Sequence, residues 1–128
     1  MPAIAITLDD DLQLTADLLE TETANAVFDA LPIEATINVW GDEHYFEIPV
    51  EAEQEAMARD IVQLGELAFW PPGNAFCIFF GRTPASKGAD EIRAASPVNV
   101  IGSLRAVPVG DLRAVPSGAK IRIEALEG

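Results

Sequence analysis

The chain has 128 residues, a formal net charge of −13, and 49% hydrophobic and 23% charged residues. The length and composition fit one soluble globular domain over residues 1–128, and no apolar run approaches the ~20 residues of a membrane span. The negative charge repels phosphate backbones, so no nucleic-acid partner is expected. The lack of a long apolar run likewise gives no reason to expect a membrane partner.

The chain begins with a predicted β-hairpin. Apolar residues alternate with small or polar ones over residues 4–8 and again over 12–18. The acidic segment 9–11 separates the two runs. Alternation with a period of two on both sides of a turn is typical of paired antiparallel strands.

Residues 21–31 change to a helical period, with apolar residues at positions i, i+3, i+4 and i+7. This stripe consists of Ala24, Val27, Phe28 and Leu31. Thr21 or Thr23 can cap the start of the helix, and Pro32 prevents its continuation. The pattern therefore predicts one short helix near the start of the chain.

The rest of the chain predicts short strands separated by turn residues. The expected strands are residues 33–40, 45–50, 64–70, 75–80, 98–104 and 120–126. We expect residues 51–60 to form a loop with at most one helical turn, 82–96 to form a long surface loop, and 111–115 to form a helical turn. Many short strands with one good helix predict a mainly β sandwich or barrel.

Most of the aromatic residues cluster between residues 40 and 80. Adjacent residues in a strand face opposite sides of a sheet, so only one member of each of the pairs 45/46, 69/70 and 79/80 can point inward. The outer rings could line a groove for an apolar ligand or a proline ring, or they could cap the ends of a barrel. The predicted groove residues are Trp40, Tyr45, Phe46, Trp70, Asn74, Phe76 and Phe79.

Few residues are suited to catalysis. The chain has no phosphate-binding loop, no dinucleotide-binding glycine motif and no Cys–His metal spacing, so we expect no cofactor and no metal. His44 is the only histidine and follows Asp42 and Glu43, with which it could act at a groove rim. A solvated histidine in a turn is the simpler interpretation.

Cysteine usage and charge give two further expectations. Cys77 is the only cysteine, so no intrachain disulfide is expected, and its apolar surroundings favour a structural role. The first residues lack the basic region of a signal peptide, which leaves a cytoplasmic location as the default.

The charge is concentrated in the first half of the chain. Residues 1–60 hold 15 acidic residues and one basic residue. That half could dock a basic partner or could serve solubility.

Three blocks of sequence resemble a family of small, largely uncharacterised bacterial and archaeal proteins with a cyclophilin-like barrel. The blocks are residues 38–46 (NVWGDEHYF), residues 70–84 (WPPG through GRTP) and residues 95–102 (ASPVNVIG). Their order and spacing agree from about residue 4 to the C-terminus. The resemblance implies a closed eight-stranded antiparallel barrel with one or two short helices capping its ends.

The same resemblance bears on function, because true cyclophilins are proline isomerases with a Phe-His-Arg strand motif. The corresponding strand here is near residues 45–49, which contain no arginine and carry Glu47 instead. Residues 73–79 resemble the strand that supplies pocket aromatics in cyclophilins. Arg82 lies beyond that strand and could replace the missing cation.

We therefore expect a protein that binds a peptide or small ligand in an aromatic groove without strong catalysis. The alternative is a weak peptidyl-prolyl isomerase that uses Arg82. A third possibility is a small-molecule enzyme that uses Asp42, Glu43 and His44. Whether the protein is an enzyme stays open, as does the choice between monomer and homodimer. The peptide bonds before Pro71 and Pro72 are expected to be trans.

Overall fold

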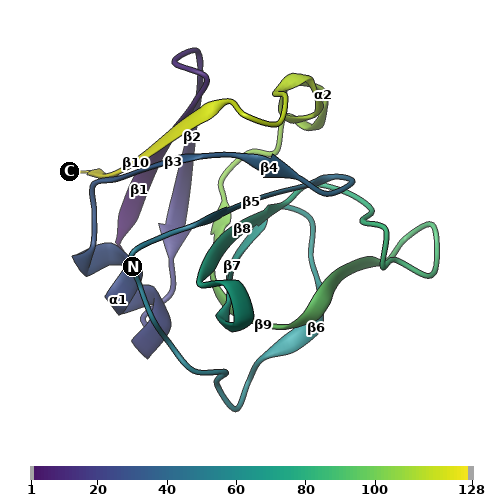
Figure 1. The fold of residues 1–128 in the computed structure, drawn as a ribbon, viewed down its shortest axis with the longest axis horizontal. Helices are drawn as coiled ribbons and strands as arrows, with labels where there is room; N and C mark the ends of the chain where they lie inside the picture. Colours follow the sequence, from purple (N-terminus) through teal and green to yellow (C-terminus); the bar gives the residue numbers. More distant parts are fainter. Residues whose placement is uncertain (1, 127–128) are drawn as a thin grey trace.

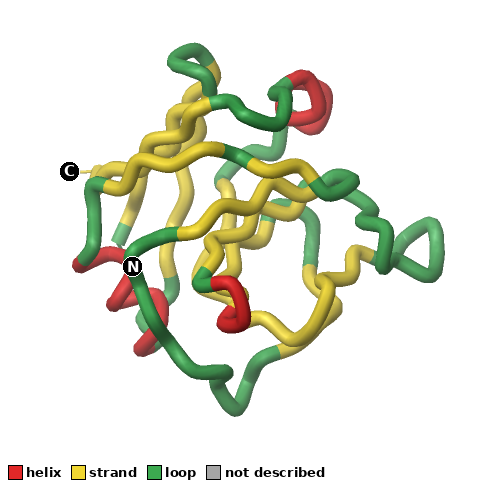
Figure 2. Tube along the Cα trace, in the orientation of Figure 1, coloured by secondary structure: helices red, strands yellow, loops and turns green. Residues whose placement is uncertain are grey.

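A computed structural model of the chain describes residues 2–126. These residues form a curved antiparallel sheet with short helices beside it (Figure 1). The strands are β1 (Ala3–Leu8), β2 (Leu12–Leu18), β3 (Ile33–Thr36), β4 (Asn38–Val39), β5 (Glu43–Glu47), β6 (Arg59–Val62), β7 (Glu66–Trp70), β8 (Ala75–Phe79), β9 (Ile92–Leu104) and β10 (Lys120–Leu126). The helices are α1 (Glu22–Asp29), the 3-10 turn η1 (Pro71–Gly73) and α2 (Val109–Ala114). Figure 2 shows α1 at the lower left and α2 at the upper right of the view, and residues of both helices pack into the same main core.

The sheet has ten strands in the order β3-β10-β1-β2-β9-β7-β8-β5-β4, and β6 pairs with β9. Its two end strands, β3 and β4, follow each other in the sequence with only Ile37 between them. The backbone of Ile37 turns aside to bond Gly118 and Ala119, each at 2.8 Å. Within residues 2–126 no ladder joins β3 to β4, so hydrogen bonds do not close the sheet.

The mainly β antiparallel prediction is confirmed, whereas the expected eight strands and closed ladder are not. The predicted strand over residues 33–40 is divided at Ile37, and β6 begins at Arg59, near the end of the expected loop 51–60. β9 begins at Ile92, within the predicted surface loop 82–96. This part of β9 consists mostly of small and polar residues, which show no strand pattern in the sequence, and Pro97 argues against a strand.

The local predictions for the helices and turns agree with the structure. The predicted hairpin is β1 and β2, and Thr21 caps α1 by accepting a hydrogen bond from the Ala24 amide at 3.1 Å. Among the described residues the only cis peptide bond is Leu31–Pro32, so the bonds before Pro71 and Pro72 are trans as predicted. None of the described helices is both long and apolar enough to cross a membrane.

Each face of the β5–β8–β7 region packs against its own cluster of apolar side chains. The inner face carries Phe46, Phe69 and Phe76, which belong to the main core. The outer face carries Ala68, Cys77 and Phe79, which pack with residues of β6 and β9. The first half of β9 covers this outer face, so even outward-pointing residues of β8 are buried.

Asn99, on β9, joins three parts of the fold through its buried side-chain amide. Its Nδ2 group donates to the Thr23 hydroxyl at 3.1 Å and to the Glu53 carbonyl at 2.9 Å. Its Oδ1 atom accepts from the Glu55 amide at 2.8 Å. Because Thr23 lies on α1 and the glutamates lie in the long loop after β5, one side chain fixes both to the sheet.

Replacing Asn99 with alanine should lower the free energy of unfolding by about 2 kcal/mol, because buried partners lose their hydrogen bonds. Urea denaturation measures the change. Ser103→Ala is the matched control, since Ser103 is exposed on the same strand. Equal unfolding midpoints for the two variants would show that the Asn99 bonds contribute nothing.

Candidate functional site

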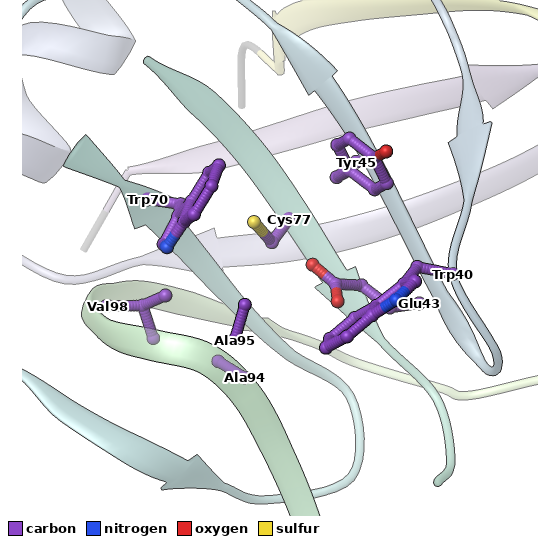
Figure 3. A pocket seen from close by; sticks show the side chains of 8 residues that line it. All are labelled: Trp40, Glu43, Tyr45, Trp70, Cys77, Ala94, Ala95 and Val98. Carbon is purple, nitrogen blue, oxygen red and sulfur yellow. The ribbon is translucent and has the colours of Figure 1, made fainter. Parts of the chain in front are cut away.

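A pocket of about 270 Å³ lies on the outer face of the sheet, between β5, β7, β8 and β9. Its lining residues are Trp40, Glu43, Tyr45, Trp70, Cys77, Ala94, Ala95 and Val98 (Figure 3). Cys77 occupies the middle of the floor, because it pairs with Tyr45 of β5 on one side and Ala68 of β7 on the other. The two tryptophans lie at opposite ends of the pocket, with the Glu43 carboxyl between them.

Glu43 supplies the one charged side chain among the eight described residues that line the pocket. The residue is 5% exposed. Burial raises the pKa of its carboxyl to about 7, and a hydrogen bond with the neighbouring Cys77 thiol opposes the shift. A group with such a pKa exchanges protons near neutral pH.

The Trp70 ring is fixed in place by two contacts. Its indole Nε1–H donates to the Ser96 hydroxyl at 2.7 Å. A Cβ atom added at Gly73 would lie 2.8 Å from the same ring, so the η1 turn packs directly on the indole. Trp70 therefore forms a rigid wall. Trp40 follows β4 and forms the opposite wall. Its backbone amide donates a hydrogen bond to the Glu43 carbonyl at 3.0 Å.

Four of the predicted site residues come together here, namely Trp40, Glu43, Tyr45 and Trp70. Phe46 and Phe76 lie instead in the main core, where their rings stack with centroids 5.2 Å apart. Phe79 is buried in the outer cluster beside the pocket. Asn74 ends the η1 turn in a left-handed conformation and lines a different hollow, beside α1.

His44 and Arg82 also lie away from the pocket lining. His44 is adjacent to Glu43 on a strand and so points to the opposite face, where it is 0% exposed and packs edge-on to Phe80. Within the described chain neither ring nitrogen has a hydrogen-bond partner, although the Leu112 backbone lies nearby. Burial lowers the pKa of His44 to about 4. Arg82 lies beyond the end of β8 and donates to the Ser86 carbonyl at 3.5 Å.

Sequence reasoning missed Cys77, Ala94, Ala95 and Val98 as lining residues. For Cys77 a signal existed, because residues 75, 77 and 79 alternate onto the face opposite Phe76. No comparable signal existed for the alanines, since residues 92–97 do not resemble a strand. Asp42 is held outside the pocket by an ion pair with Arg113 at 2.7 Å.

The acidic first half of the chain forms a second hollow. Glu22, Glu51, Glu53 and Glu55 line it beside α1. Glu55 is engaged within the fold, since its carboxylate accepts from the Thr23 hydroxyl at 2.6 Å. Among the described residues, no three His, Cys, Asp or Glu side chains gather as metal ligands do. A basic partner for this surface stays a prediction.

Comparison with known families supports the resemblance noted in the sequence. A protein-family model described as Cyclophilin-like matches residues 2–124. The chain belongs to this cyclophilin-like family. The solution structure of a hypothetical protein from Archaeoglobus fulgidus, AF2241, superposes on this cyclophilin-like chain with a TM-score of 0.81. The two share 40% sequence identity over 98% of this chain and 95% of the archaeal one.

A second solved structure shares the fold at lower similarity. McbB in complex with tryptophan superposes with a TM-score of 0.67 and 16% identity, over 94% of this chain and 44% of McbB. The cyclophilin-like chain thus spans less than half of McbB. A search of curated proteins found no match.

Proposed function

We propose that this cyclophilin-like protein binds a small molecule with a flat aromatic ring in the pocket between Trp40 and Trp70. The observation that carries the proposal is the arrangement of two indoles around a largely apolar space with one charged group, Glu43. Ligand pockets are mostly apolar concavities in which a few polar groups fix orientation. A volume of about 270 Å³ favours a small molecule over an extended peptide.

The proline-isomerase alternative receives less support from this geometry. It requires a cation that weakens the X–Pro amide, and the described pocket lining contains no arginine or lysine. Arg82, the candidate cation, lies beyond the end of β8 and outside that lining. The McbB structure, by comparison, holds tryptophan, which is itself a flat aromatic compound. Indole compounds are therefore the first probes.

Calorimetric titration with indole should give a heat of binding that saturates, because both tryptophans of the chain line the pocket and stack on the ring. Trp40→Ala should weaken binding by about five- to 150-fold, since stacking on one aromatic side chain is worth about 1–3 kcal/mol. Val39→Ala is the control, because Val39 is exposed next to Trp40 and outside the pocket.

Two results would overturn the proposal. One is an absence of saturable binding by indole compounds. The other is equal binding by the Trp40→Ala and Val39→Ala variants. Catalysed cis/trans exchange of a short X–Pro peptide, lost in Arg82→Ala, would establish the isomerase alternative instead.

A further inference from the structure

We infer that the natural ligand of the pocket is an organic cation, a protonated amine carried on a flat aromatic ring, with the Glu43 carboxylate as its counter-ion. The inference rests on the proposed function and adds the charge of the ligand. It assigns Glu43 a specificity-determining role.

The first argument is the missing partner of Glu43. The partly buried acids Asp42 and Asp17 each have an arginine partner, in the Asp42–Arg113 pair at 2.7 Å and the Asp17–Arg105 pair at 2.8 Å. Glu43 is more deeply buried than either, yet no described lining residue carries a positive charge. A buried carboxylate without a partner is unstable, and a cation bound beside it removes that cost.

The second argument is the lining itself. Aromatic faces attract cations, tryptophan most strongly. Trp40, Trp70 and Tyr45 surround the space into which the Glu43 carboxyl points (Figure 3). The net charge of −13 acts in the same direction, because it draws cations toward the protein and repels anions. Carboxyl, aromatic lining and overall field therefore all select against a negatively charged ligand.

The protonation state of Glu43 then controls affinity. The groups that face its carboxyl are the Cys77 thiol of β8, the Tyr45 phenol of β5, the Trp40 ring and the uncharged side chains of β9. His44 lies on the opposite face, and Asp42 is paired with Arg113. The pKa of Glu43 is about 7, so near and below neutral pH the carboxyl carries a proton. A cation that needs the carboxylate therefore displaces that proton from Glu43 when it binds. Affinity for the cation should rise with pH, whereas affinity for a neutral ring should not.

A charge series on one ring tests the inference. Indole, tryptamine and indole-3-propionate carry the same ring with neutral, positive and negative charge at pH 8. We expect tryptamine to bind at least tenfold more tightly than indole, and indole-3-propionate at least tenfold more weakly. Glu43→Gln should remove the preference for tryptamine over indole. Glu47→Gln is the matched control, because it removes one charge from the exposed end of the same strand.

A second measurement uses only the unaltered protein, so it holds even where a variant does not fold. Tryptamine affinity should fall toward tenfold per pH unit below about pH 7, and calorimetry in buffers of different ionisation enthalpy should detect proton release. Tryptamine binding no tighter than indole, or an equal loss of preference in Glu47→Gln, would overturn the inference while indole binding still stands. Binding of none of the three compounds would instead overturn the proposed function.

Discussion

Gly102→Ala should lower the free energy of unfolding by about 3 kcal/mol or more, since forcing atoms into a packed region displaces the backbone. Gly102 lies where β9 pairs with β2, opposite Leu18. A Cβ atom at this position would lie 2.3 Å from the Asp17 carbonyl oxygen and 3.0 Å from the Leu18 Cα. Both obstacles are backbone atoms of a paired strand, so no side chain can move aside to make room. The melting temperature should fall by about 10 °C.

Gly110→Ala is the matched control for this prediction. Gly110 lies in α2 and is exposed, and a Cβ atom there would meet nothing within 4 Å. Alanine favours a helix over glycine, so this variant should be as stable as the original protein or slightly more stable. Equal losses of stability in the two variants would contradict the steric explanation.

Removing either Glu43 or His44 should make the free energy of unfolding depend on pH. In the original protein the contributions of the two residues to that dependence have opposite sign and cancel. Burial raises the pKa of Glu43 from 4.5 to about 7, so the folded state holds a proton that the unfolded chain has lost. Burial lowers the pKa of His44 from 6.5 to about 4, so the unfolded chain holds a proton that the folded state lacks. Between pH 4.5 and 6.5 these two effects on the free energy of unfolding have opposite sign.

Chemical denaturation at several pH values measures the expected behaviour of the variants. In Glu43→Gln the free energy of unfolding should rise by about 3 kcal/mol as pH increases through this window, because only the His44 effect is left. In His44→Leu it should fall by about 3 kcal/mol from pH 4.5 to 7, because only the Glu43 effect is left. The double variant should behave like the original protein. Parallel pH profiles for the two single variants would contradict the opposed shifts.

The fold was predictable from the sequence wherever one face of an element meets water. The hairpin of β1 and β2 and the helix α1 have clear periodicity, and the sequence also shows the N-cap Thr21 and, beyond the C-cap Ala30, the helix-breaking Pro32. β6 and the first half of β9 were not predictable, because they cover a second apolar cluster and pair with a register shift. Tertiary packing forms these strands, and their residues carry no strand pattern of their own.

The candidate site was predictable only in part, for the same reason. Strand alternation separates Trp70, which lines the pocket, from Phe69, which lies in the core. The predicted groove was wrong to include both Tyr45 and Phe46, because only Tyr45 faces the pocket. Alternation fails for Phe79, because β6 and β9 cover the outer face and bury that ring as well. The burial of Glu43 and His44 was also hidden, since GDEH in a sequence is typical of a solvated turn.

Val98 and Asn99 are neighbours on β9 whose side chains face opposite sides of the strand. Val98 lines the aromatic pocket, while the Asn99 amide anchors the acidic loop that borders the hollow beside α1. One segment of β9 thus lines the aromatic pocket and also holds the loop that borders the hollow beside α1. We expect the local opening of the loop and the occupancy of the pocket to be coupled through β9, and amide hydrogen exchange at residues 53–55, measured with and without indole, tests that coupling.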